Sequence, residues 1–279
     1  MMLRIGDAAF SYLEAGRGTP VVFLHGVGSA GRSFADQIPA LAQHYRVLAW
    51  DAPGYGLSTA PAEADPDPGV YAAALLKLLD GLDIGPCHLV GHSLGALIAA
   101  RFAADHSDRV LSLTLCSIAA GHAMLPAEER RRLLDQRLAD VATLGPRAMA
   151  EKRGPRLLGP DATPEMIRRV IDTMAAIRPD GYGQAARMLS NGDVKADIAR
   201  LPPGLPLQVV FGEADVITPP ARNREIAAGR PHTAVHAIEG AGHAVYLEKP
   251  ERFNALIGDF IARAIVGDFV ARHAMDLTE

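Results

Sequence analysis

The stretch Gly91-His92-Ser93-Leu94-Gly95 decides the fold of this chain. It follows the apolar run 87–90 and precedes the small-residue stretch 96–100, a pattern that predicts a strand, a tight turn and a helix meeting at one serine. The flanking glycines permit the strained backbone of such a turn and the close approach of helix to strand. Ser93 is therefore expected on a nucleophile elbow, a tight turn that makes the serine hydroxyl accessible.

The composition is that of a protein with a large buried core. The chain has 279 residues, of which 49% are hydrophobic and 22% charged, enough for one domain with an inserted subdomain. The formal net charge of -4 provides no basic field for neutralising phosphates, so nucleic acid is not expected as a partner.

Cys87 and Cys116 lie in runs that predict buried strands, where a cysteine normally acts as a small apolar filler. We therefore expect no redox or metal role for them. The chain opens without the pattern of a signal peptide and contains no run of 18 or more apolar residues, so we expect a cytoplasmic protein with no membrane association.

Short β-rich runs alternate with helical patterns along most of the chain, which predicts a parallel sheet with helices on both faces. An antiparallel opening is expected at 3–5 and 9–14, with a turn at Gly6-Asp7. The other expected strands are 21–25, 46–51, 88–91, 110–116, 207–212 and 233–238. The expected helices are 33–44, 70–82, 94–105, 220–228 and 250–264, with a helical pattern again in the tail 266–279.

The alternation stops between about Ala120 and Asp193, where helical spacing replaces strand patterns. We interpret this segment as a helical cap, with residues 1–119 and 194–279 forming the two parts of the core domain. The cap contains 12 Arg and Lys against 10 Asp and Glu, a balance of 12 - 10 = +2. Most of these arginines are expected on solvated helix faces, but one or two turned inward could hold a substrate carboxylate.

A serine nucleophile needs a base, and the base needs a carboxylate that sets its tautomer. Asp215 ends the segment Val209-Val-Phe-Gly-Glu-Ala-Asp215, and His243 ends Gly240-Ala-Gly-His243, so both follow expected strands. Glu213 is the rival acid, and His232 and His236 are the rival bases. We expect Ser93, Asp215 and His243 to form the catalytic triad.

Acyl transfer also needs donors for the oxygen that gains negative charge. The backbone N–H of Leu94, directly after the serine, and that of Val27, in His25-Gly-Val-Gly28, are the candidates for the oxyanion hole. His25 is expected to brace this loop rather than transfer a proton, and His92 is expected to serve packing.

These motifs together resemble the α/β-hydrolase superfamily. The resemblance rests on His25-Gly26, Asp51-Ala-Pro-Gly-Tyr-Gly-Leu-Ser58, Gly91-His-Ser-Leu-Gly95, Gly212-Glu-Ala-Asp215 and Gly240-Ala-Gly-His243, which span nearly all of the chain outside the cap. The chain order Ser, Asp, His is also the order of this superfamily. The resemblance implies an α/β fold with a mostly parallel eight-stranded sheet, a cap inserted after the sixth strand, and a hydrolase that uses neither a cofactor nor a metal.

Within the superfamily the chain is most similar to 3-oxoadipate enol-lactonases and related carboxylesterases, through Gln37-Ile-Pro-Ala-Leu41, Tyr45-Arg-Val-Leu48, Pro179-Asp-Gly-Tyr182 and Ile217-Thr-Pro-Pro220. The loop that begins at His25-Gly26, and Phe34 in place of a common tryptophan, depart from that group. The likeness implies a serine hydrolase of a small ester or lactone that could bear a carboxylate. The alternatives are carbon–carbon or amide hydrolysis with the same triad, although the loop lacks the Gly-Pro-Gly run of the ring-cleavage hydrolases, and a noncatalytic ligand receptor. The sequence leaves the oligomeric state open.

Overall fold

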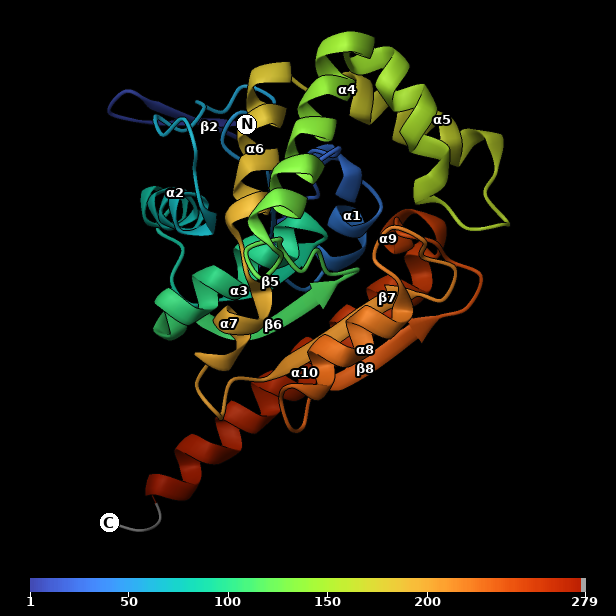
Figure 1. Cartoon of the computed structure of the whole chain (residues 1–279). Coiled ribbons are helices and arrows are strands. Elements are labelled where there is room, and N and C mark those ends of the chain that lie inside the picture. Colours follow the sequence, from blue (N-terminus) through green and yellow to red (C-terminus); the bar gives the residue numbers. More distant parts are fainter. Residues whose placement is uncertain (277–279) are drawn as a thin grey trace.

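The chain folds around an eight-stranded sheet with helices on both sides (Figure 1). The computed structural model describes the fold of residues 1–276 and the side-chain surroundings of residues 1–266. The strand order is β1-β2-β4-β3-β5-β6-β7-β8. The first two strands pair antiparallel, β2 also runs antiparallel to β4, and all pairs from β4–β3 to β7–β8 are parallel. This is the predicted α/β-hydrolase fold, mostly parallel and eight-stranded.

The strands follow the expected runs within one or two residues at each end. Two of them, β6 and β7, have the predicted bounds. The strands are β1 (Met2–Ile5), β2 (Ala8–Ala15), β3 (Pro20–Leu24), β4 (Arg46–Trp50), β5 (Cys87–His92), β6 (Val110–Cys116), β7 (Leu207–Gly212) and β8 (Ala234–Ile238).

Alternate side chains of the central strands lie in two separate hydrophobic cores, one on each face of the sheet. Val22 and Leu24 of β3 face the core that contains the buried side chains of α2 (Pro68–Gly81) and α3 (Leu94–Asp105). Val21 and Phe23 face the opposite core with α9 (Val245–Glu248) and α10 (Pro250–Asp276). Because successive side chains of a strand point to opposite faces, runs that are apolar throughout are what a sheet covered on both faces requires.

The segment between β6 and β7 is helical, in agreement with the absence of strand patterns there. Its elements are α4 (Ala127–Arg153), η3 (Gly154–Leu157), α5 (Pro164–Ala175), α6 (Pro179–Asn191) and α7 (Val194–Ala199). Helices α4, α5 and α6 lie together on one side of the molecule (Figure 1). Whether residues 120–193 form a separate cap stays a prediction.

The prediction of one helix over 33–44 is wrong in one respect, because the structure has two short helical elements there with a break between them. The structure has a 3-10 turn η1 (Gly31–Phe34) and a short helix α1 (Gln37–Leu41). Pro39 explains the break: its ring clashes with the carbonyl four residues earlier, so a helix that contains it begins shortly before it.

The remaining helices are η2 (Ser107–Arg109) and α8 (Pro220–Ala228), which has the predicted bounds. Helix α10 continues past the expected end at 264 to Asp276. The sequence leaves open whether Phe269 and Val270 of the tail pack on the core or on a neighbouring subunit, and both lie outside the residues whose side chains are described. Within the described part of the chain, no helix combines the length and apolar character needed to cross a bilayer.

Candidate active site

Ser93 occupies a strained turn between the central strand β5 and helix α3. Its φ of 55° and ψ of -113° lie in a region that L-residues rarely adopt. The backbone N–H of Ser93 donates to the carbonyl of Cys116 at 2.8 Å, and its own carbonyl accepts from Ala119 at 3.3 Å. These bonds attach the turn to the residues at the end of the neighbouring strand β6, so contacts with the sheet stabilise the strained backbone conformation of Ser93.

The two glycines of the pentapeptide are required by close contacts. A Cβ on Gly91 would lie 2.3 Å from the carbonyl oxygen of Gly95, and a Cβ on Gly95 would lie 2.1 Å from that of Leu24. No side chain fits at either distance, because the helix start lies directly against the strands. The sequence interpretation of these glycines is confirmed.

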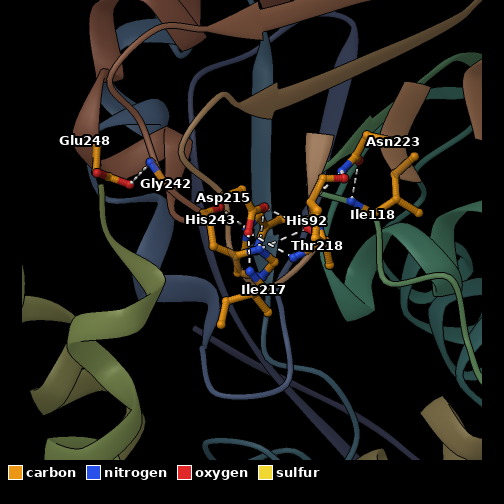
Figure 2. A network of polar contacts seen from close by, with 10 residues as sticks. His92, Ile118, Asp215, Ile217, Thr218, Asn223, Gly242, His243 and Glu248 are labelled. Atoms are coloured by element: carbon orange, nitrogen blue, oxygen red, sulfur yellow. Dashed lines mark hydrogen bonds and ion pairs between the residues drawn. The ribbon is translucent and has the colours of Figure 1, made fainter. Parts of the chain in front are cut away.

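Asp215 and His243 follow neighbouring parallel strands and meet at the same edge of the sheet. The Nδ1 atom of His243 lies 2.8 Å from Oδ2 of Asp215 (Figure 2). Because an ionised carboxylate only accepts, Nδ1 carries the proton in this bond, and Nε2 is left as the basic nitrogen. Both side chains are buried, with residue exposures of 2% for Asp215 and 4% for His243.

The carboxylate of Asp215 is held by its own loop as well. Oδ1 accepts the N–H groups of Ile217 at 2.8 Å and Thr218 at 2.9 Å, and the Thr218 hydroxyl donates to Oδ2 at 2.7 Å. Burial raises the pKa of Asp215, but the hydrogen bond and charge of His243, with the bonds from Thr218, outweigh it and lower the pKa to about 2. Asp215 is therefore ionised wherever the protein works near neutral pH.

Ser93 and His243 line one cavity. Among the hydrogen bonds of the described residues, none joins the Ser93 hydroxyl directly to the His243 ring, whereas the His243–Asp215 bond is formed. The rival groups lie elsewhere, because Glu213 and His232 are exposed and His236 belongs to β8. None of these three residues contributes to the cavity wall.

Val27 and Leu94 also line this cavity, and their backbone N–H groups have no acceptor among the described residues. Leu94 opens helix α3, so its N–H has no intrahelical partner. The peptide unit that carries the Val27 N–H is fixed at its carbonyl end, since Nδ1 of His25 lies 2.8 Å from the Gly26 carbonyl oxygen, and the next peptide unit is fixed by the Tyr55 hydroxyl, which donates to the Val27 carbonyl at 2.6 Å. Two fixed, unused donors beside a serine form an arrangement that can hold an oxyanion.

His25 braces the loop that carries Val27, as expected. The backbone N–H of Ala52 donates to Nε2 of His25 at 3.0 Å, so the proton of this ring lies on Nδ1, which contacts the Gly26 carbonyl at 2.8 Å. Burial lowers the pKa of His25. With both nitrogens engaged, His25 has no free position for proton transfer.

His92 is buried and packs against neighbouring rings, as expected, and it also makes a hydrogen bond that the sequence does not predict. Its Nε2 lies 2.8 Å from the backbone carbonyl of His243, and the two rings are 4.8 Å apart between centroids. Burial, together with the charge of His243, lowers the pKa of His92 to about 3. A neutral His92 therefore holds the main chain of the histidine loop from the nucleophile side (Figure 2).

Glu248 and Asn223 hold the site in place and were not found by sequence reasoning (Figure 2). Glu248 is buried and accepts the N–H groups of Gly242 at 2.9 Å and Gly159 at 2.6 Å. Asn223 accepts from the N–H of Ile118 at 2.9 Å and donates to the Thr218 carbonyl at 2.8 Å. Neither residue stands in a glycine-flanked loop, so only the fold reveals these contacts.

The cavity has a volume of about 560 Å³ and lies between the strand ends and helices α4, α5 and α6. Its wall is unusually basic. Seven cationic side chains contribute to it against one carboxylate, that of Asp140. The cations are Arg32, Arg137, Lys152, Arg153, Arg156, Arg169 and Arg222.

Comparison with known proteins agrees with the fold. A family model described as alpha/beta hydrolase fold matches residues 19–250. A relative in Variovorax paradoxus (strain S110), RutD, whose name assigns it a carbamate hydrolase activity, is 32% identical over 251 residues, which are 88% of this chain and 92% of the relative.

Two solved structures are similar over nearly the whole chain. A thermophilic esterase from Thermogutta terrifontis, determined with malate bound, has a TM-score of 0.82 at 27% identity and covers 92% of this chain and 94% of its own. The enol-lactonase from Burkholderia xenovorans LB400 has a TM-score of 0.84 at 23% identity and covers 94% and 100%. At that identity the enol-lactonase supports the fold alone.

Proposed function

Because the chain belongs to the alpha/beta hydrolase fold family, we propose that it is a serine hydrolase that cleaves a small carboxylic ester or lactone through an acyl-enzyme. The observation that carries the proposal is the bond of 2.8 Å between His243 Nδ1 and Asp215 at the edge of the cavity that also contains Ser93. This bond leaves the other imidazole nitrogen free to act as a base.

In the proposed mechanism, Nε2 of His243 removes the hydroxyl proton of Ser93 while the serine oxygen forms a bond to the substrate carbonyl carbon. The N–H groups of Val27 and Leu94 donate to the resulting oxyanion. Collapse breaks the bond to the alcohol oxygen, which takes the proton from His243. Water then attacks the acyl-enzyme, His243 takes a proton from it and returns one to Ser93, and the carboxylic acid leaves.

Asp215 contributes orientation and charge to this mechanism. Its carboxylate holds the Nδ1–H tautomer of His243 and stabilises the imidazolium that forms in each half-reaction. The four contacts that hold Asp215 come from His243 and from its own loop, so the carboxylate does not have to reorganise during turnover.

Two similar proteins bear on which bond is cleaved. RutD is named for carbamate hydrolysis and the Thermogutta protein is an esterase, and both chemistries use attack on a carbonyl carbon. The bound malate in that esterase is a dicarboxylate, which agrees with the basic wall of the cavity in this chain. We favour an ester or lactone over a carbon–carbon or amide bond because an alkoxide is the easier leaving group. No metal or organic cofactor enters the proposed steps.

The test combines active-site labelling with turnover. The wild-type protein is treated with a fluorophosphonate probe and assayed with p-nitrophenyl esters and small lactones, alongside Ser93→Ala and the control Ser33→Ala. We expect label and turnover in wild type and Ser33→Ala, whose serine also lines the cavity, and loss of both in Ser93→Ala with an unchanged circular dichroism spectrum.

Retention of more than a few per cent of turnover in Ser93→Ala would remove Ser93 as nucleophile. Absence of label in folded wild-type protein would instead favour a ligand receptor on this fold. Faster hydrolysis of vinylogous diketones or amides than of any ester or lactone would replace the proposed substrate class by the alternative one.

A further inference from the structure

The side chain of Thr218 contacts both the acid and the base of the candidate triad (Figure 2). Its Oγ1 lies 2.7 Å from Oδ2 of Asp215 and 3.2 Å from Nδ1 of His243. Because Nδ1 carries the ring proton in the His243–Asp215 bond, it cannot accept a second one, so the Thr218 hydroxyl donates to Oδ2. One carboxylate oxygen therefore accepts from the threonine and from the histidine at the same time.

Four donors occupy the carboxylate of Asp215. Oδ1 accepts the N–H groups of Ile217 and Thr218, and Oδ2 accepts the ring of His243 and the Thr218 hydroxyl. An ionised carboxylate offers about four lone-pair sites, so the group is saturated. Burial acts to raise the pKa of Asp215, and the contacts of His243 and Thr218 together lower it to about 2. Of these donors, the hydroxyl is the one that a side-chain substitution removes while the main chain and the ring stay in place.

The position of Thr218 is fixed before a substrate binds. Pro219 follows it and restricts its backbone to extended conformations, and its branched Cβ restricts the side-chain rotamer. Its N–H donates to Asp215, and its carbonyl accepts from Nδ2 of Asn223 at 2.8 Å. Asn223 is fully buried and accepts in turn from the N–H of Ile118 at 2.9 Å. The hydroxyl is thus held against the carboxylate by the fold.

Neighbouring elements also carry charged or titratable groups. They are His92 on β5, Tyr246 and Glu248 on α9, Arg222 on α8, and Lys152 and Arg156 on the far wall of the cavity. Burial, with the charge of His243, lowers the pKa of His92 to about 3, and burial raises the pKa of Glu248. A substitution at Thr218 leaves all of these groups unchanged, so a comparison of variants at this position isolates the effect of the hydroxyl.

We propose that Thr218 is a positioning residue whose hydroxyl holds Oδ2 of Asp215 against the Nδ1–H of His243 and limits the negative charge that the carboxylate presents to the ring. This deepens the proposed function and rests on it. A carboxylate that gives up charge to another donor stabilises a protonated imidazole less. With the hydroxyl present, the ring is therefore available as a base down to a lower pH. Without it, the ring keeps its proton to a higher pH.

The kinetic test uses Thr218→Val, which replaces the hydroxyl by a methyl group, and Thr218→Ala, which removes it without adding bulk beside Oδ2. We expect both to raise the midpoint of the acid limb of kcat/KM against pH by about half a pH unit. The plateau kcat should fall by about three- to tenfold, the effect of losing one hydrogen bond, and KM should stay within about twofold. Thr218→Ser keeps the hydroxyl and should restore the midpoint and most of kcat.

The matched control is Thr114→Val on β6. Thr114 is as deeply buried, and its hydroxyl accepts from Nε2 of Gln208 at 2.9 Å, away from the cavity wall. This variant should lower the thermal unfolding temperature and leave the midpoint at the wild-type value. A midpoint that stays unchanged in both Thr218→Val and Thr218→Ala, or that moves equally in Thr114→Val, would overturn the proposal. If Thr218→Val does not fold, Thr218→Ala and Thr218→Ser decide.

A double variant tests whether Thr218 acts through Asp215. When Thr218→Val is added to Asp215→Asn, the carboxylate on which the hydroxyl acts is already gone, so kcat should change by less than about twofold. A further loss as large as that of Thr218→Val alone would show that the hydroxyl acts elsewhere. A raised KM with an unchanged kcat in the single variant would likewise overturn the role, because it would indicate contact with the substrate.

A measurement without turnover separates this role from the proposed function. The protein is labelled with ¹³C-histidine, and the Cε1 resonance of His243, assigned by its loss in His243→Gln, is followed against pH in wild type, Thr218→Val and Thr114→Val. A titration midpoint that rises in Thr218→Val alone supports the role even if no ester or lactone is hydrolysed, and that case counts against the proposed function alone. A midpoint that Thr218→Val leaves unchanged would overturn the role whether or not the protein is an esterase.

Discussion

At the scale of single residues, His243 is held from several directions. Asp215 contacts its ring at Nδ1, His92 contacts its backbone carbonyl, and Glu248 accepts the N–H of the preceding residue Gly242. These contacts come from three different parts of the chain. The imidazole is therefore positioned before any substrate arrives, which is what base catalysis requires.

Replacement of Asp215 by asparagine tests the residue that sets the tautomer of His243. An amide at this position can donate to Nδ1, which would move the ring proton to Nε2 and remove the base. We expect kcat to fall by roughly 10⁴, the size of the effect known for other triads, with little change in KM. The measurement is steady-state hydrolysis of the best ester from the substrate panel.

Glu213→Gln is the matched control for this variant, because Glu213 is exposed and lies two residues before Asp215. It should keep kcat within about twofold of wild type, as surface substitutions commonly do. A larger loss in Glu213→Gln than in Asp215→Asn would mean that the catalytic acid is misassigned.

The sequence predicts residues that stand in glycine-rich loops directly after strands. Ser93 and His243 have that local pattern, and Asp215 follows a strand of the expected length. The cavity shared by Ser93 and His243, and the bond between His243 and Asp215, could therefore be anticipated. Thr218 and Asn223 have no such pattern, because a threonine in a loop and an asparagine in a helix have many ordinary roles. Their contacts depend on how distant elements pack, which one sequence does not specify.

At the scale of elements, the prediction succeeded where periodicity and turn signals agree and failed where one residue overrides the period. The strands read as continuous apolar runs because both faces of the sheet are covered. Pro39 broke the helix expected over 33–44. In α4, Gly145 has a φ of 69° and a ψ of 167°, so this element bends at the Gly145-Pro146 pair.

Glu248 connects two loops of different elements. One carboxylate oxygen accepts from Gly159, in the helical segment between β6 and β7, and the other accepts from Gly242 beside His243. The contact is close-packed, since a Cβ on Gly159 would lie 2.5 Å from the Gly240 carbonyl oxygen. A movement of the α4–α5 segment would thus be transmitted to the histidine loop.

We expect Glu248→Gln to cost about 1–3 kcal/mol in the free energy of unfolding and to lower kcat several-fold. The side-chain amide can accept one of the two N–H groups, but its NH₂ group then faces the other, which leaves a buried donor without a partner. Thermal unfolding and steady-state kinetics measure the two effects. Glu251→Gln, at an exposed position in the first turn of α10, is the control and should match wild type in both. An unchanged kcat in Glu248→Gln would show that the loop keeps its place without this contact.

At the scale of the whole molecule, buried histidines determine how stability depends on pH. His88 and His92 have exposures of 1% and 4%, and both lie on the central strand β5. Burial lowers the pKa of His88 to about 4 and, with the charge of His243, that of His92 to about 3. In an unfolded chain the pKa of histidine is about 6.5. The unfolded state therefore binds protons that the folded state does not.

Because the pKa values of these histidines are depressed in the folded state, the stability they contribute is present above about pH 6.5 and is lost as the pH falls toward 4 and 3. We expect the free energy of unfolding to decrease below pH 6 by roughly 1 kcal/mol per pH unit for each of the two groups. Urea unfolding at pH 7, 6, 5 and 4.5 measures this slope. His88→Asn should reduce the slope by about 1 kcal/mol per pH unit whatever its effect at pH 7, the share of one among several histidines whose pKa burial lowers, His25 and His122 included. His232→Asn, at an exposed position, should leave the slope unchanged. A slope in His88→Asn equal to that of wild type would mean that His88 can be protonated in the folded protein. The acid sensitivity would then arise from carboxylates such as Asp215, whose contribution to stability is lost only as the pH falls from about 4 to about 2.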